Sequence, residues 1–291
     1  MTTVPDGSDQ AMAWLVLAHE GPDQLRALLE RIAPAGGPDF AVVHLDRKSA
    51  LWRETQGAFL VDLPNVTVIA DPTAVHWAHA SQVEAIRLVL REALRRPFRH
   101  AHLISGVDWP LVGRSTILSA LARAEGRDCL IEADPGVQSW RMERISLHAR
   151  WLRPDPGNAF AVRREWLLRR LSARLPARTA QPWGPWHKGS TWWSLPREVC
   201  ERVHAELSGP AASRALRFTQ CADEHAIQTI VARHFPERIA DPRRYISWTG
   251  DWSPRVLTSA DWPAAQASGA WLARKVSAAI DPFFLAEALR P

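Results

Sequence analysis

Lysine, cysteine and tyrosine are scarce in this 291-residue chain, and the lysine shortage is the most informative. Only Lys48, Lys188 and Lys275 are lysines among 36 basic residues, and the rest are arginines. The two side chains are not interchangeable at a tight site, because the guanidinium is broad and planar whereas the ammonium is compact. We therefore expect a lysine kept in such an arginine-rich chain to mark a position where a guanidinium does not fit.

The three cysteines, Cys129, Cys200 and Cys221, are far apart and none forms a C-x-x-C pair. An odd number at such spacing excludes a disulfide framework and a zinc knuckle. Histidine provides no metal site either, since His76 and His79 are three residues apart but no carboxylate or cysteine completes a ligand set. We expect reduced thiols and no bound metal.

Long apolar runs and nucleotide or hydrolase signatures are also missing. No stretch approaches the ~20 apolar residues of a membrane-spanning helix, and residues 1–10 do not resemble a signal peptide. These features predict a soluble, cytoplasmic protein. Walker A, G-x-G-x-x-G, G-x-S-x-G and H-E-x-x-H motifs do not occur, which argues against most NTPases, dehydrogenases, esterases and metalloproteases.

The chain does have an excess of basic over acidic residues, with a formal net charge of +5 and a pI near 9.7. Such a charge suits a polyanion, and a nucleotide diphosphate is one. The cations are scattered rather than gathered in a dense run, so the pattern does not favour nucleic acid.

Short apolar runs alternate with amphipathic segments in the first half of the chain, which predicts an α/β fold with a mainly parallel sheet flanked by helices. We expect one domain over 1–291, with a nucleotide-binding half (1–135) and an acceptor-binding and catalytic half (136–291). The expected strands are 13–18, 40–45, 66–69, 102–104 and 129–131. The expected helices are 25–32, 117–124 and one beginning at a capping box, Ser81 to Glu84.

The second half is less regular. A strand is expected over 190–195, with Trp192 and Trp193 on opposite faces, and helices over 197–207, 224–234 and 264–273. The Arg-, Trp- and Pro-rich segment 150–185 is typical of a mobile or acceptor-shaping insertion.

Ligands of parallel α/β sheets lie beyond the carboxyl ends of the strands. Asp46, the segment 105–108 and Glu132 follow such ends directly. Asp223 and Glu224 open a helical segment; a solvated capping pair is the simpler interpretation, and a general base is the functional one.

Two cations and several tryptophans likewise allow both a structural and a functional interpretation. Arg255 and Lys275 are either ordinary surface cations or groups that stabilise a departing diphosphate. Fifteen tryptophans accompany a single tyrosine. Their flat faces suit sugar rings as well as protein cores, and Trp77, Trp109 and Trp248 are the better stacking candidates because polar turns flank them.

In order along the chain, these segments resemble the core-2/I-branching β-1,6-N-acetylglucosaminyltransferase family, which includes the peptide O-xylosyltransferases. Each segment is short, but the ordered set is specific. The matching segments are 15–19, 43–49, 81–85, 102–111, 189–195, 223–224, 228–229, 244–248, 253–257 and 273–275.

The resemblance implies an inverting, metal-independent glycosyltransferase of the GT-A type that uses a UDP-sugar and no cofactor. Glu224 is similar to the family's catalytic base, and Arg255 and Lys275 match its diphosphate-binding cations. Asp46 looks like the acidic residue near the uridine and ribose, and His19 falls among the donor-binding positions. No D-x-D motif occurs, although many GT-A enzymes hold a divalent ion with one.

On the acceptor side, the resemblance implies roles for Glu132, Trp248, Asp108 and Trp109, with a carbohydrate, glycopeptide or small-molecule hydroxyl as the acceptor. Basic residues after Glu132, Arg141 among them, align only approximately. N-acetylglucosamine is the family-weighted donor sugar, and xylose or another sugar stays open.

The chain departs from the animal members, which carry a membrane anchor and disulfides, and so looks like a bacterial relative. A non-catalytic carbohydrate- or nucleotide-binding module on the same scaffold is the competing interpretation. A sulfotransferase is disfavoured because residues 19–23, after the first strand, are too acidic and proline-broken for a phosphate loop.

Overall fold

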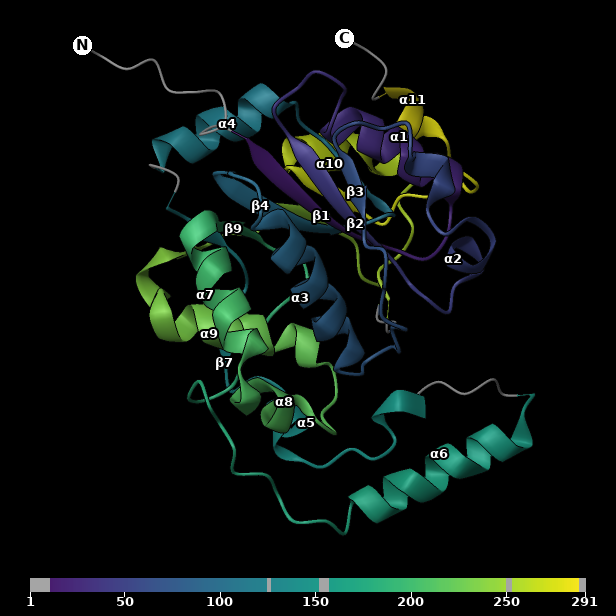
Figure 1. Cartoon of the computed structure of the whole chain (residues 1–291), viewed down its shortest axis with the longest axis vertical. Helices are drawn as coiled ribbons and strands as arrows, with labels where there is room; N and C mark the ends of the chain where they lie inside the picture. Colours follow the sequence, from purple (N-terminus) through teal and green to yellow (C-terminus); the bar gives the residue numbers. More distant parts are fainter. Residues whose placement is uncertain (1–10, 125–126, 152–156, 250–252, 288–291) are drawn as a thin grey trace.

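The computed structural model describes residues 11–124, 127–151, 157–249 and 253–287. Its centre is a seven-stranded sheet of order β10-β6-β9-β4-β1-β2-β3 (Figure 1). Every pair in it is parallel except those of β9, which runs antiparallel to β4 and β6. The expected single α/β domain with a mainly parallel sheet is confirmed. The strands are β1 (Met12–Ala18), β2 (Phe40–Leu45), β3 (Val66–Val68), β4 (His100–Ser105), β6 (Cys129–Leu130), β9 (Ser194–Pro196) and β10 (Ile239–Ala240).

Two small sheets extend the carboxyl edge of the large one. In the first, β12 (Leu272–Arg274) pairs with β11 (Arg244–Ile246) and with β5 (Asp108–Pro110). In the second, β7 (Asp134–Pro135) pairs with β8 (His187–Lys188). Both bring residues from the second half of the chain to the strand ends of the first half.

Strands β1, β2 and β4 are buried along almost their whole length, which explains the nearly unbroken apolar sequence of β1 and β2. Strand β4 also buries His100 and His102. Alternation along β1 sends Leu15 into one core and Trp14 and Val16 into the other. Each fully buried side chain of this size contributes about 1.5–3 kcal/mol to folding.

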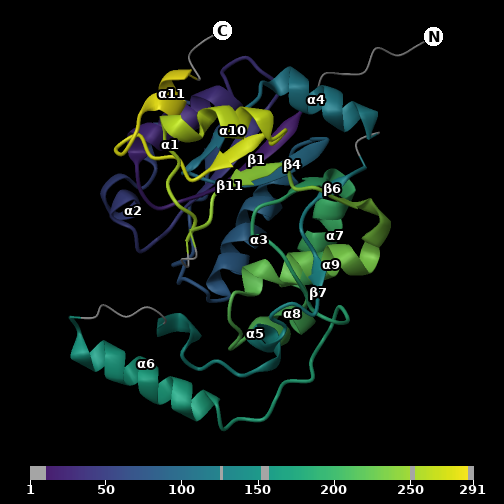
Figure 2. The same ribbon diagram turned by 180° about the vertical axis from the view of Figure 1, so that it is seen from behind.

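Helices cover both faces of the sheet (Figures 1 and 2). The core that contains Leu15 is closed by α3 (Ser81–Ala93), α7 (Arg197–Ser208) and α9 (Ala226–His234). The opposite core is closed by α1 (Pro22–Ile32), α4 (Arg114–Arg123) and α10 (Trp262–Ala267). The remaining helices are α2 (Ala50–Thr55), α5 (Trp140–Glu143), α6 (Ala159–Ser172), α8 (Pro210–Leu216) and α11 (Phe283–Glu287).

Short 3₁₀ turns complete the described chain. They are η2 (Ala58–Leu60), η3 (Ala149–Trp151), η4 (Ala222–Glu224), η5 (Pro236–Arg238) and η6 (Ser259–Asp261).

Some local expectations were wrong. The capping box at Ser81 does not form, because its hydroxyl accepts the His76 N–H instead of capping α3. Trp192 and Trp193 are both buried and precede the short strand β9 rather than alternating along it. The helix expected over 264–273 ends at Ala267, and residues 272–274 form β12.

Helix α6 lies apart from the layered body in both views (Figures 1 and 2). It occupies the middle of the 150–185 segment. Among the described residues, no helix combines the length and apolarity needed to cross a membrane.

Candidate active site

Glu224 ends the turn η4 and lies against two cations. Its Oε2 atom is 2.7 Å from Nη1 of Arg141 and 3.8 Å from Nζ of Lys188, and its side chain is 32% exposed. Lys188 is in β8, whereas Arg141 is in α5, so the ion pairs join three separate segments. The carboxylate is thus held in place yet remains accessible.

Asp223, next to Glu224, has a very different environment. It is buried, and its Oδ2 atom accepts a 2.6 Å hydrogen bond from the Thr191 hydroxyl. Burial, assisted by the negative charge of Glu224, raises the pKa of Asp223 from 3.8 to about 6, although the Thr191 hydrogen bond opposes the change. The two adjacent carboxyl groups therefore differ. Glu224 is partly exposed and paired with cations, whereas Asp223 is buried and has a pKa of about 6.

Gly189 lets the backbone segments around this pair approach closely. Its N–H donates to the Glu224 carbonyl at 2.9 Å. A Cβ atom at this position would lie 2.0 Å from the Glu132 carbonyl oxygen, so no other residue fits without backbone movement. The Glu132 carboxylate accepts the Ser190 N–H at 3.0 Å. Glu132 and Glu224 consequently lie on either side of Gly189.

Asp46, at the end of β2, is also nearly buried. It accepts the backbone N–H of Val75 at 3.0 Å and pairs with Nζ of Lys48 at 2.9 Å. Three residues beyond Val75, the Ala78 carbonyl accepts the Cys221 N–H at 2.8 Å. The loop 75–78 therefore links Asp46 to the segment that carries Glu224.

The C-terminal cations lie on neighbouring segments. Arg255 makes a bidentate ion pair with Asp261, at 2.8 and 2.5 Å, which lowers the pKa of Asp261 to about 2. Nζ of Lys275 donates to the Ser253 hydroxyl at 2.6 Å, and the Lys275 carbonyl accepts the Leu257 N–H at 2.7 Å. The segments 253–257 and 274–275 are thereby held together.

Arg274 connects these segments to the rest of the site. Its guanidinium donates to Asp108 at 2.6 Å and to the Ser105 hydroxyl, and it lies 4.3 Å over the ring of Trp192. Trp192 follows Thr191, the partner of Asp223. The contact of Arg274 with Trp192 therefore connects the segment 274–275 to the segment 191–192, which bonds to Asp223.

The other predicted site residues differ in their exposure to solvent. Asp108 is buried among its hydrogen bonds, and Trp109 is 2% exposed in the core, so neither presents a surface to a sugar here. Trp248 is 60% exposed. His19 is exposed at the end of β1, 3.6 Å from Glu20.

Three residues of the site went unassigned in the sequence: Arg141, Lys188 and Thr191. Arg141 lies in a stretch with no strong periodicity. Lys188 did carry a signal, since all three lysines occur at these clusters, beside Asp46, Glu224 and Ser253. Among the described residues, no three His, Cys, Asp or Glu side chains gather as a metal site would require.

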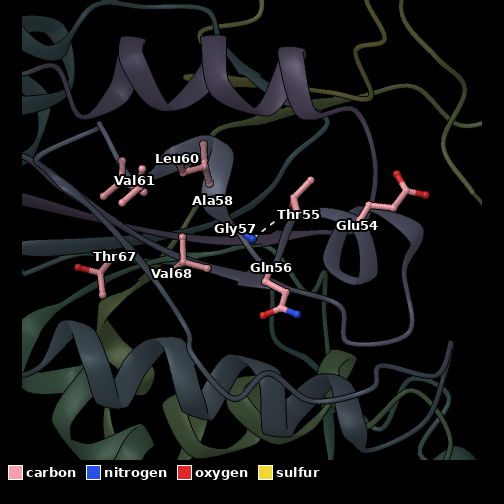
Figure 3. Close-up of a pocket in the computed structure, with 10 residues that line it drawn as sticks. Glu54, Thr55, Gln56, Gly57, Ala58, Leu60, Val61, Thr67 and Val68 are labelled. Atoms are coloured by element: carbon pink, nitrogen blue, oxygen red, sulfur yellow. Dashed lines mark hydrogen bonds between the residues drawn. The ribbon is translucent and has the colours of Figure 1, made fainter.

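Two cavities among the described residues are compared with the site. One, of about 610 Å³, lies at the β3 edge between residues 54–61 and 66–68, and contains none of the site residues (Figure 3). The other, of about 490 Å³, borders Arg141 and Cys221 and therefore adjoins Glu224.

Comparison with known proteins gives one family. The family described as Core-2/I-Branching enzyme matches residues 12–267. No curated protein matches the chain.

Similar solved structures are distant. The apo WbbM bifunctional glycosyltransferase shares 14% identity at a TM-score of 0.41, over 94% of this chain and 46% of its own. The 4-diphosphocytidyl-2C-methyl-D-erythritol synthase of Anaerococcus prevotii DSM 20548 shares 11% identity at a TM-score of 0.37, over 90% of this chain and 96% of its own.

Proposed function

The chain belongs to the Core-2/I-Branching enzyme family of glycosyltransferases, and from this we propose that it transfers a sugar from a UDP-sugar to an acceptor hydroxyl. We propose further that the transfer is a single, inverting displacement on a GT-A fold and requires no metal ion. N-acetylglucosamine is the proposed sugar, with xylose as the alternative.

Glu224 acts as the general base in this proposal. Its carboxylate takes the proton of the acceptor hydroxyl while the hydroxyl oxygen forms a bond to the anomeric carbon. The bond from that carbon to the UDP oxygen breaks on the opposite face, and the electron pair leaves with UDP. The observation that carries the proposal is the accessible Glu224 carboxylate, fixed by Arg141 at 2.7 Å.

Arg255 and Lys275 stabilise the leaving diphosphate. Fixed cations in this role act as a metal ion does. They stabilise the negative charge that develops on the departing oxygen in the transition state more than they stabilise the bound donor. The contact of Arg274 with Trp192 supports this role because it connects the segment that carries Lys275 to the one that bonds to Asp223. Asp46 and His19 are proposed to bind the nucleoside, because the Asp46 N–H donates to the carbonyl of Ala18, next to His19, at 2.9 Å.

The test is transfer from a panel of UDP-sugars in excess EDTA, comparing wild type, Glu224→Gln and the exposed control Glu54→Gln. We expect wild type and the control to be active, whereas Glu224→Gln binds UDP normally and loses a factor on the order of 10² to 10⁴ in rate. Undiminished turnover by Glu224→Gln excludes its role as base. Activity that appears only with added manganese excludes the metal-free mechanism.

A further inference from the structure

The cavity beside Arg141 has aromatic walls that the proposed transfer reaction does not by itself require. Four segments form it: the loop that carries Trp77, α5 with the residues after it, the inner side of α6, and Gln220 with Cys221. Trp77 and Trp140 are both partly exposed there. The lining residues are Trp77, Ala78, Trp140, Arg141, Arg144, Ile145, Ser146, His148, Glu165, Arg169, Ser172, Ala173, Gln220 and Cys221.

The polar groups on the floor of this cavity bond to one another. Gln220 Nε2 is 2.6 Å from His148 Nε2, and His148 Nδ1 is 3.3 Å from the Ser172 hydroxyl. Arg169 likewise pairs with Glu165 at 2.7 Å, and Arg141 pairs with Glu224. Most of these polar groups therefore already have partners, and the two indole rings offer a ligand apolar contact. Flat apolar groups bind such faces well.

Size and position also point to a ligand. A cavity of about 490 Å³ falls in the range that encloses a drug-sized molecule. Cys221 lines it, and Glu224 donates its backbone N–H to the Cys221 carbonyl at 3.0 Å. A molecule seated in the cavity thus lies beside the segment that carries the base.

On the basis of the proposed function, we propose that this cavity binds a flat, apolar aglycone and that the acceptor is an aglycone-bearing hydroxyl compound rather than a free sugar. The aglycone fills the space between Trp77, Trp140 and α6, and the attached hydroxyl is directed to Glu224.

The experiment is titration calorimetry with UDP present, using 4-methylumbelliferyl glycosides and methyl glycosides of the same sugars as probes. Each sugar serves as its own control, because only the aglycone differs. The proteins are wild type, Trp77→Ala, Trp140→Ala and, as matched control, Trp166→Ala, which removes an exposed α6 indole outside the cavity lining.

We expect the aryl glycosides to bind wild type and Trp166→Ala at least about tenfold more tightly than the methyl glycosides, about 1.4 kcal/mol. That advantage should fall below about threefold in both cavity variants. Equal binding of aryl and methyl probes, or an aryl advantage that survives both cavity substitutions, overturns the proposal. UDP binding and Glu224-dependent transfer are measured separately, so failure of the proposed function is distinguishable.

The outer side of α6 supports a second, independent inference. Phe160, Leu167, Leu171 and Leu175 recur at spacings of seven, four and four, which places them along one side of the helix and its end. They are 40% to 76% exposed. The cavity-lining residues of α6 lie on a different side. Soluble surfaces rarely leave such a row of large apolar side chains uncovered.

Charge identifies what would cover this row. Residues 157–178 contain six arginines and one glutamate, a formal net charge of +5, as large as that of the whole chain. Arg163, Arg170 and Arg174 are exposed beside the apolar row, and their guanidinium groups can reach lipid phosphates while the apolar side chains enter the headgroup region. The structure assigns this face of α6 to the surface of a membrane rich in anionic lipid.

Co-sedimentation with vesicles tests this assignment. The vesicles are phosphatidylcholine alone or with 30% phosphatidylglycerol, by design. Two triple variants, Phe160→Ser/Leu167→Ser/Leu171→Ser and Arg163→Gln/Arg170→Gln/Arg174→Gln, are compared with wild type and with Val61→Ser, an exposed apolar control far along the chain.

We expect wild type and the control to bind the anionic vesicles at least about tenfold more tightly than the neutral ones, and each triple variant to lose that binding, because both apolar burial and charge contribute. Equal binding to both vesicles, no binding, or a lipid-free dimer that the apolar triple variant abolishes overturns the assignment.

Discussion

The two ends of the candidate site are charged in opposite ways. At one end, the carboxylate of Glu224 lies between two cations, Arg141 and Lys188. At the other end, the cation Arg255 is bound in a bidentate ion pair by the carboxylate of Asp261. In both places the functional group is positioned by a partner of opposite charge. The comparison suggests that positioning, as much as charge, is what the fold provides at each end.

Among the substitutions that test this comparison, we expect Lys275→Ala to have the largest effect on the rate of transfer. We expect Lys275→Ala to lower kcat by a factor on the order of 10² to 10³, because a preorganised cation opposite the leaving group is removed. UDP release under saturating donor measures it. Arg53→Ala, on the exposed side of α2, is the control, and a Lys275→Ala rate within threefold of wild type contradicts the role.

Asp223 is expected to give the next largest effect, on stability rather than rate. Its pKa is about 6 in the folded protein against 3.8 ordinarily, so the folded state holds its proton more tightly and stability falls as pH rises through this window. The difference corresponds to about 3 kcal/mol.

Urea unfolding at pH 3 to 7 checks this prediction. Relative to Asp223→Asn, wild type should lose about 3 kcal/mol of unfolding free energy between pH 3 and pH 7. The exposed control Asp23→Asn should parallel wild type. If the difference in unfolding free energy between wild type and Asp223→Asn is constant across this range, burial does not raise the pKa of Asp223.

At the base end, Arg141→Gln removes the closer of the two cations. We expect kcat to fall about tenfold with UDP binding unchanged, since misplacing a catalytic group lowers the chemical step without affecting the donor. Transfer kinetics and UDP titration together measure it. A change confined to UDP affinity would place Arg141 with the nucleotide instead.

At the cation end, Asp261→Asn removes the bidentate partner of Arg255. We expect UDP to bind about fivefold more weakly, because the guanidinium loses the geometry that the paired hydrogen bonds impose. Calorimetry with UDP measures it, with Asp241→Asn as an exposed control. Tighter UDP binding would show that Asp261 competes with the diphosphate, and the comparison between the two ends would fail.

Much of the fold was predictable from the sequence, because buried strands and helix faces require apolar residues at regular spacings. The apolar runs of β1 and β2 and the amphipathic stripe of α3 all fall where expected. The segment 272–274 was not predictable, because its alanine-rich surroundings favour a helix while pairing with Tyr245 and Trp109 makes it a strand.

The candidate site divides in the same way. Asp46 and Glu132 were marked by strand ends, which the sequence shows. Arg141 reaches the site only through tertiary packing, from a stretch with no strong periodicity. Thr191 lies in the expected strand 190–195, but nothing in that pattern distinguished it from its neighbours. Lys188 lies between these cases, since the scarcity of lysine that drew attention to Lys275 applied to it equally.

The loop 75–78 has a consequence for motion. Val75 holds the carboxylate at the end of β2, and Ala78 holds the turn before Glu224, each through a backbone hydrogen bond. A motion at this loop that separated Asp46 from the segment of Glu224 would break both bonds, each worth about 0.5–1.5 kcal/mol. The two bonds therefore favour a constant distance between Asp46 and the turn before Glu224.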